Sequence, residues 1–204
     1  MTYQTLLDDY NAITGSTTSA QSVYFVNLAL RWAWGMDDST FAWPQTLTTN
    51  ASVTVTSGVI AWTDVGSSDW VSFWRTDPRL PAGNIFPGIP YLNWGYNRTV
   101  PPVPVTWDGT QFNVQDSSIS TPVFAFYRTA VPQATFNGGY TATILPFMRD
   151  PVVRYAVAEY FASIASLERE GTFRAKAIDW YDSNKASIVN SDAGCPWLGN
   201  IILT

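Results

Sequence analysis

The sequence contains no histidine and a single cysteine, Cys195. Without histidine, Ser-His-Asp and Cys-His catalysis and every zinc site with a histidine ligand are excluded. One cysteine forms neither a disulfide within the chain nor a thiolate cluster. A glycine-rich phosphate loop of the Walker or dinucleotide type is also missing. We therefore expect a chain that binds no cofactor, holds no metal and is not an enzyme.

Charged residues are scarce. They make up 13% of the chain, about half of the roughly 25% that is usual in soluble domains. Apolar residues make up 46%, with ten tryptophans, ten tyrosines and eleven phenylalanines. Partner proteins that cover part of the surface would explain this deficit of charge. An aromatic-rich β core explains it as well, and both interpretations stay open.

The formal net charge is −5, and the 11 basic residues form no cluster. This argues against a patch that tracks nucleic-acid phosphates, although DNA could still pass nearby. No apolar run approaches the ~20 residues of a membrane-spanning helix. Residues 1–10 lack the basic start and apolar run of a secretory signal. The expectation is a soluble protein made in a reducing cytoplasm, without a membrane partner.

The clearest periodic signal lies at 150–190 and predicts two helices. Asp150 and Pro151 are typical of a helix start, and Gly171 is expected to end the first helix before Thr172 caps the second. Apolar residues recur at helical spacing along both segments. Those expected on the inner faces include Val153, Val157, Phe161, Tyr181 and Ile188.

Helices are also predicted at 2–12 and 20–35, the second capped by Thr18 or Ser19. The middle of the chain predicts strands, among them a hairpin with its turn at Asp108-Gly109. The expected strands lie at 52–56, 59–62, 70–75, 105–107, 111–114, 122–128 and 139–145. Residues 79–104 are dense in proline, glycine and aromatics, which predicts a long ordered loop of functional or interface character.

Two helices, about six strands and two more helices do not alternate as βαβ units do. The order predicts an α+β fold: a helical bundle from the N- and C-terminal helices, with an inserted antiparallel β-rich region. The expected division is 1–45, 46–146, 147–190 and a tail at 191–204, all within one structural domain. The apolar end of the tail either folds back on its own core or docks on a neighbour.

Adjacent acids are the first candidates for chemistry. Two facing carboxylates could hydrolyse a glycoside, but Asp8 with Asp9 and Asp37 with Asp38 are sequence neighbours. Such neighbours point apart on a helix or cap a turn. A hard metal at Asp37, Asp38 and Asp69 lacks EF-hand spacing.

Glu159 is the one acid with an interior position in its predicted helix. We expect it to pair with an arginine such as Arg128 or Arg154 rather than to act in catalysis.

Aromatic residues could form a stacking platform for sugars: Trp62, Trp70, Trp74, Tyr91, Trp94, Tyr96 and Trp107. Aromatics in strands are more often core residues. Tyr91, Trp94 and Tyr96 lie in the loop instead, where we expect a surface contact with a partner.

Several local motifs occur in a particular order. The helix at 20–35 ends in Arg31-Trp32-Ala33-Trp34, and Phe41-Ala42-Trp43-Pro44 follows. A strand ends in Phe73-Trp74-Arg75-Thr76-Asp77-Pro78, and a helical pair opens after Pro146. This layout resembles the head-to-tail adaptor (connector, or neck) proteins of tailed bacteriophages, and it is similar to the podovirus tail tubular protein A, or gatekeeper. The long loop and the low charge depart from that pattern.

The resemblance implies a virion structural protein made in the host cytoplasm. Its copies would form a dodecameric homo-oligomeric ring between the portal protein and the tail or a second neck protein. The ring would continue the DNA channel, with DNA only as passing cargo, and no catalysis is implied.

The resemblance also implies roles for two segments. The helical pair at 150–190 would pack neighbouring subunits of the ring, with Val153, Val157, Phe161, Tyr181 and Ile188 on the packing faces. The tail would dock on the portal or a neighbour through Cys195, Trp197, Leu198, Ile201, Ile202 and Leu203. A carbohydrate-binding β module of a tail or fibre is the alternative, and a hydrolase with two carboxylates is the third hypothesis.

Overall fold

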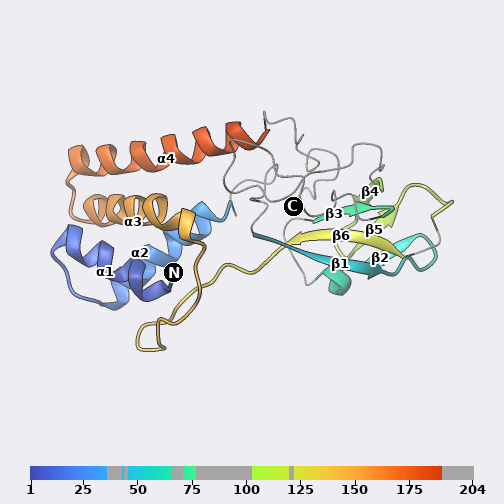
Figure 1. Ribbon diagram of the computed structural model, residues 1–204, viewed down its shortest axis with the longest axis horizontal. Coiled ribbons are helices and arrows are strands. Elements are labelled where there is room, and N and C mark those ends of the chain that lie inside the picture. The colour runs from blue at the N-terminus through green and yellow to red at the C-terminus, as the bar shows by residue number, and fades with distance from the viewer. Residues whose placement is uncertain (36–42, 44–45, 66–70, 77–102, 120–121, 190–204) are drawn as a thin grey trace, which may run out of the picture. The chain divides into compact units, whose positions relative to one another are not determined.

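The structure of the 204-residue chain is a computed structural model, and it describes all residues except 36–42, 44–45, 66–70, 77–102, 120–121 and 190–204 (Figure 1). Within this part, helices occur together with antiparallel sheets, which confirms the α+β class. The chain forms two compact units. The helical unit combines Met1–Asp37 with Val131–Ala186, and the β unit lies within Asp38–Ala130.

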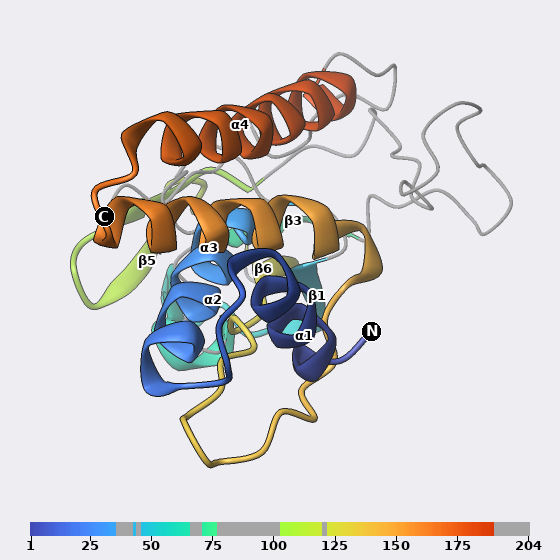
Figure 2. The ribbon, with the colours of Figure 1, turned by 90° about the vertical axis from the view of Figure 1, so that its left-hand side faces the viewer.

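In the part of the chain that the structure describes, four α-helices build the helical unit. They are α1 (Tyr3–Thr14), α2 (Ala20–Ala33), α3 (Arg149–Ser163) and α4 (Leu167–Val189), with a short 3-10 helix, η3 (Pro146–Met148), ahead of α3. Both α1 and α2 pack on α3. Figures 1 and 2 show α3 between α4 and the pair of α1 and α2. The two helices nearest the N-terminus thus find their partner in a helix from the far end of the chain.

Local sequence signals set the limits of α1 and α2. Gly15 ends α1 in the left-handed conformation, with φ of 70°. Ser19 caps α2 as predicted: its hydroxyl accepts a hydrogen bond from the Ser22 amide, and the Ser22 hydroxyl accepts one from the Ser19 amide. This reciprocal cap satisfies amides that the first helical turn leaves open. The apolar side of α2 is buried, and Val26 and Leu30 have no exposed surface.

The break between α3 and α4 is not at Gly171, so that prediction was wrong. The chain turns at Ala165, which has φ of 57°. The amide of Ser166 donates to the Phe161 carbonyl and the amide of Ala165 to the Ala162 carbonyl. This is the hydrogen-bond pattern of a Schellman cap, which usually carries glycine at the left-handed position. Gly171 lies inside α4 instead.

The start of α3 also differs from the prediction. The helix begins at Arg149, Met148 takes the N-cap position, and Asp150 lies in the first turn. The preceding 3-10 helix supplies the entry, with the Arg149 amide bonded to the Pro146 carbonyl. No Asp cap is needed there, because the chain enters the helix from an existing turn.

The described residues of the β unit form two antiparallel three-stranded sheets, in the orders β1-β6-β3 and β2-β5-β4. The strands are β1 (Leu47–Val53), β2 (Val59–Ala61), β3 (Val71–Trp74), β4 (Val105–Trp107), β5 (Gln111–Val114) and β6 (Val123–Arg128). Phe73 of β3 meets Phe112 of β5 edge to face at 5.1 Å. Both rings are fully buried, so this contact joins the two sheets into one core.

Two strand predictions were wrong. The first strand begins at Leu47 and ends at Val53, earlier than the predicted 52–56. Its pairing with β6 extends it backwards, because Leu47 lies opposite Arg128. The predicted strand at 139–145 does not form. That segment makes a single bridge, between Thr143 and Thr2, and it accepts hydrogen bonds from the first amides of α1.

The β4–β5 hairpin forms as predicted, but its turn lies one residue further on. The Asp108 amide donates to the Gln111 carbonyl, which leaves Gly109 and Thr110 at the centre. Gly109 has φ of 99°. A positive φ at the first central residue alone is the pattern of a type II′ turn, which favours glycine there.

Candidate functional site

The most unusual surface of the described chain belongs to α4. With 23 residues, it is the longest of the described helices. Among its described side chains, only Ala177 and Tyr181 are buried. Large rings join it to the other helices: Tyr181 meets Trp32 at 5.4 Å, and Phe173 stacks on Phe161 at 5.7 Å. One side of α4 is therefore anchored, and the opposite side is open to solvent.

An ionic cluster reinforces the anchored side. The Arg174 guanidinium lies 2.9 Å from the Glu159 carboxylate of α3, and it also pairs with Glu170 one turn earlier in α4. It lies over the Tyr155 ring at 5.0 Å. Burial by itself lowers the pKa of Arg174, but the hydrogen bonds that its guanidinium donates to Glu170 and Glu159 outweigh this effect, so the pKa is raised.

This cluster corrects the expectation for Glu159, whose partner is neither Arg128 nor Arg154. Arg154 pairs with Asp150 on its own helix. Sequence spacing alone does not place Arg174 opposite Glu159, because the sequence predicts a helix boundary at Gly171, between these two residues, whereas α4 begins at Leu167.

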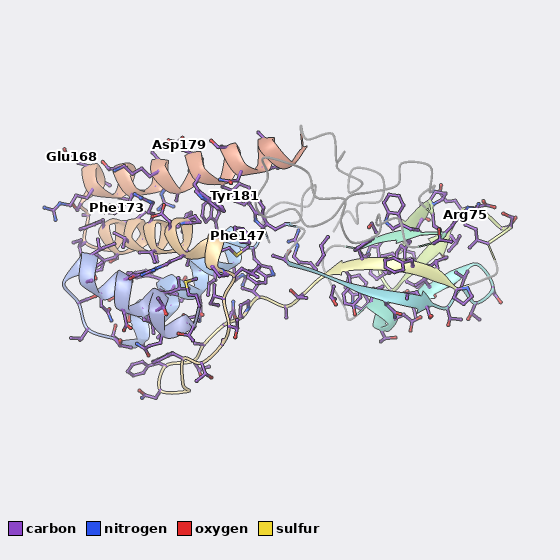
Figure 3. The ribbon with its side chains drawn as sticks, in the orientation of Figure 1. Arg75, Phe147, Glu168, Phe173, Asp179 and Tyr181 are labelled. Atoms are coloured by element: carbon purple, nitrogen blue, oxygen red, sulfur yellow. The ribbon has the colours of Figure 1, made fainter. Side chains whose placement is uncertain are left out.

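The outer face of α4 consists of residues that point away from α3. Figure 3 shows Glu168 and Asp179 on this side, with Phe173 and Tyr181 on the other. Helical spacing places Gly171, Ala175, Ile178 and Asp182 on the same face as Glu168 and Asp179, and all six are exposed. All three charged members of this face are acidic. We call these six residues the α4 outer face.

Exposed apolar side chains lie on and beside this face. Leu167 is 74% exposed, Ile164 is 54% exposed and Ile178 is 41% exposed. The sequence places Ile164 and Leu167 in the buried apolar stripe of the first predicted helix, and that prediction was wrong, because the chain turns at Ala165 and leaves both side chains exposed. Ile178 is not among the residues that the sequence assigns to a buried face. The available signal for Ile178 was its position away from the inner face expected of the second helix, in a chain with little charge.

The residues expected to pack ring neighbours lie elsewhere. Val153, Val157, Phe161 and Tyr181 are all buried in the helical unit. There they pack on the chain's own helices. Ile188 falls within the bounds of α4, but its side chain is outside the described residues. Among the described side chains of α4, the exposed ones are therefore not those that the sequence assigned to packing.

The predicted partner contacts lie outside the described residues. They are Tyr91, Trp94 and Tyr96 of the loop and Cys195, Trp197, Leu198, Ile201, Ile202 and Leu203 of the tail. The same holds for Trp70, Asp37, Asp38 and Asp69.

The aromatic residues of the β unit separate into two groups. Trp74 is buried, and its indole N–H donates to the Ser72 hydroxyl at 3.1 Å, as suits a core residue. Trp62 and Trp107 are half-buried, with ring centres 4.6 Å apart. Both also contact the Phe112 ring of the core. The structure thus brings together two members of the predicted platform, with part of each ring at the surface.

Several of the described acids serve structural contacts. Asp8 accepts a hydrogen bond from Gln4, and Asp9 forms a two-pronged pair with Arg149 at 2.6 and 2.8 Å. Arg75, labelled in Figure 3, pairs with Asp116. Hydrogen bonds from the Ser118 hydroxyl and amide, with the nearby Arg75, lower the pKa of Asp116.

Asp108 organises the hairpin turn. Its carboxylate accepts hydrogen bonds from the Asn113 side chain and from the amides of Thr110 and Gln111. These bonds favour the charged form and lower the pKa of Asp108 well below its usual range.

Among the described residues, no group of three or more histidine, cysteine, aspartate or glutamate side chains is placed to hold a metal ion. Within the same residues, no helix has the length and apolar character to cross a membrane. No protein-family model matches the sequence, and no curated protein matches it significantly.

Proposed function

We propose that this protein is a virion structural protein: a head-to-tail adaptor whose copies form a ring between the portal and the tail. The observation that supports this most is the α4 outer face. A long helix held on one side, with exposed apolar residues beside the other, is typical of an element that another chain covers. The resemblance in layout supplies the identity of the assembly.

Association would draw on apolar area removed from water. Leu167, Ile178 and Ile164 are large and exposed, and burial contributes about 25 cal/mol per Å² of apolar surface. The free energy gained by this burial must exceed the entropy cost of ordering the subunits. Several weak contacts around a ring therefore suit this surface better than one tight dimer contact. The net charge of −5 would keep passing DNA from adhering to the channel wall.

Peptide mass spectrometry on purified particles from the source tests the proposal. The copy number of this chain is measured relative to the portal protein. We expect a ratio near one chain per portal subunit. Absence from particles would overturn the adaptor function, and a large excess would point to a tail-tube, fibre or capsid-surface role.

A deletion tests the portal as partner. We expect a chain without residues 197–204 to lose ring or portal association, because that segment carries the apolar end of the tail. Co-sedimentation with portal particles measures this. A matched chain in which Trp197, Leu198, Ile201, Ile202 and Leu203 are replaced by serine separates the loss of apolar contact from the loss of length. Undiminished co-sedimentation of both chains would exclude the tail as the docking segment.

Trp62 and Trp107 favour a second candidate function, carbohydrate binding. Their partly exposed rings at one end of the small sheet suit stacking on a sugar face. Titration of tryptophan fluorescence with phage-receptor glycans tests it, with Trp107→Ala as the variant and Trp74→Phe as the control in the core. An unchanged spectrum at millimolar glycan would exclude it.

A further inference from the structure

The outer side of α2 is a second helix face at the surface of the helical unit. Tyr24 is 60% exposed. Leu28 follows one turn later and Arg31 one turn after that, which places all three on one side of the helix. Leu28 is half-buried and Arg31 is exposed, while the opposite side of α2 is buried on α3. We call Tyr24, Leu28 and Arg31 the α2 outer face. It carries one basic residue and no acid.

The charges of the two outer faces are opposite and unsatisfied. Neither Arg31 of α2 nor Asp182 of α4 forms an ion pair or hydrogen bond through its side chain within the part of the chain that the structure describes. Asp179 on the same face of α4 is equally unpaired there. An exposed arginine and two exposed aspartates attract each other across a contact without first breaking an internal pair.

The spacing on the two faces matches as well. Tyr24 and Arg31 are separated by two helical turns, and so are Ala175 and Asp182. Two turns correspond to roughly 10 Å along a helix axis. With the helices side by side and parallel, the Tyr24 ring would lie on Ala175 while Arg31 lies next to Asp182. A small residue under a large ring allows close approach of two helices.

The apolar residues between these two points also correspond. Leu28 stands four residues after Tyr24, and Ile178 stands three residues after Ala175. In the same parallel arrangement the two side chains would therefore meet at one level. Their contact would remove from water an isoleucine that is exposed and a leucine that the chain itself covers only in part.

The positions of the two faces fit a contact between different surfaces of successive copies. Because α3 lies between α4 and the pair of α1 and α2 (Figures 1 and 2), the two outer faces point to opposite sides of the helical unit. A chain therefore cannot join its own two faces. Contacts of this head-to-tail kind generate a closed ring when the rotation between copies closes.

We propose that the α2 outer face of one copy packs on the α4 outer face of the next copy. Tyr24 contacts Ala175, and Arg31 pairs with Asp182. Leu28 covers part of the apolar surface between these two contacts. The partner is a second copy of this chain. This inference rests on the proposed ring and specifies the surfaces that close it.

Charge reversal tests the pairing. The variants are Arg31→Asp, Asp182→Arg and the double variant with both changes, made in the full chain. Sedimentation velocity over a concentration series gives the dissociation constant. We expect each single reversal to weaken association at least about tenfold, because like charges then face each other, and the double variant to recover most of the loss. Lys176→Asp, with the same charge change beside the α4 outer face, is expected to associate as the wild type does.

Cross-linking tests the contact itself. In a Cys195→Ser background, Tyr24→Cys and Ala175→Cys are combined in one chain and oxidised mildly. We expect a ladder of covalent oligomers longer than dimers, and the two single-cysteine variants to stop at dimers. The chain keeps its fold in all of them, because Tyr24 and Ala175 are exposed; circular dichroism verifies this.

The possible results are distinct. Recovery in the double charge reversal together with a ladder supports the interface. Single reversals that leave association unchanged, or a wild-type chain that stays monomeric up to about 1 mM, overturn it. Particle mass spectrometry tests the adaptor function separately. If it finds one chain per portal subunit while the reversal variants associate normally, the adaptor function is supported and this interface is overturned.

Discussion

The guanidinium of Arg174 on α4 lies 2.9 Å from the carboxylate of Glu159 on α3. Both side chains are largely shielded, with 28% and 20% of their surfaces exposed. The same guanidinium lies over the Tyr155 ring of α3, and Tyr155 stacks on Trp32. Trp32 in turn meets Tyr181, two turns after Arg174 on α4. Charge and aromatic contacts thus hold α4 at successive turns of the helix.

Removal of Glu159 tests the contribution of this pair. We expect Glu159→Ala to lower the free energy of unfolding of the helical unit by about 1–2 kcal/mol, as for other hydrogen bonds to charged groups. Urea unfolding followed by circular dichroism measures it. Lys176→Ala is the control, since Lys176 is exposed on the same helix. Equal stability of the two variants would mean that the aromatic contacts alone hold α4.

The glycine of this region stands six residues after the position that needs one. Ala165 adopts φ of 57°, which costs a residue with a Cβ about 1 kcal/mol. Gly171 lies in the helix, and a Cβ added there meets nothing within 4 Å. We expect Ala165→Gly and Gly171→Ala each to raise stability by about 0.5–1 kcal/mol.

The two changes should add, because they act on separate turns of the backbone. Thermal unfolding of both single variants and the double variant measures this. Ser163→Gly, at the last residue of α3, is the reverse control and is expected to destabilise. A destabilising Ala165→Gly would show that the turn depends on something other than the left-handed conformation.

Asn27 of α2 holds the segment that leads back to α3. Its side chain donates to the Ala134 carbonyl at 2.8 Å and accepts from the Ala134 amide at 3.1 Å, and the Tyr3 hydroxyl donates to it. We expect Asn27→Ala to cost about 2 kcal/mol, because it leaves partly buried polar groups without partners. Urea unfolding compares it with Gln21→Ala, which changes an exposed residue of the same helix. A loss no greater than in that control would contradict the expectation.

The hairpin at Asp108 predicts a pH dependence. The pKa of Asp108 is lower in the folded chain than in the unfolded one. Its contribution to the free energy of unfolding is therefore complete above the unfolded pKa and is lost as the pH falls. The wild type should therefore lose stability of the β unit below about pH 4. Asp108→Ala should be less stable than the wild type at neutral pH, and its stability should fall less on acidification.

Tryptophan fluorescence during denaturant unfolding, repeated from pH 6 to pH 2, follows this change through Trp62 and Trp107. Asp64→Ala is the control: the Asp64 side chain accepts no hydrogen bond among the described residues, whereas its carbonyl binds Asn50. Parallel pH curves for wild type and Asp108→Ala would contradict the role of the carboxylate.

Sequence patterns predicted the elements that local chemistry specifies. The Ser19 cap, the apolar stripe of α2 and the β4–β5 hairpin all follow from residues within one or two turns of each other. The break after α3 was not predicted correctly, because the residue in the left-handed conformation is Ala165, whereas Gly171 lies within α4. Residues 139–145 have strand composition, but their hydrogen bonds go to the start of α1, which only the folded chain reveals.

The candidate site was less predictable for the same reason. Apolar periodicity selects buried positions, so it identified Val157 and Phe161, which pack inside the chain. The exposed residues of α4 become apparent only when α3 and the aromatic contacts are in place. The partner of Glu159 could be identified only from the structure, in which α4 continues through Gly171.

The division of the helical unit between the two ends of the chain has a consequence for synthesis. All six described strands are complete once Arg128 has been made, whereas α3 is complete only at Ser163. Until then, Leu6 of α1 and Val26 of α2, both fully buried in the finished protein, have no helix to cover them. Such long-range contacts form late. A nascent chain that stalls before α3 therefore carries an uncovered apolar helix pair together with a β unit whose strands are already complete, and it is the form most exposed to aggregation and most in need of a chaperone.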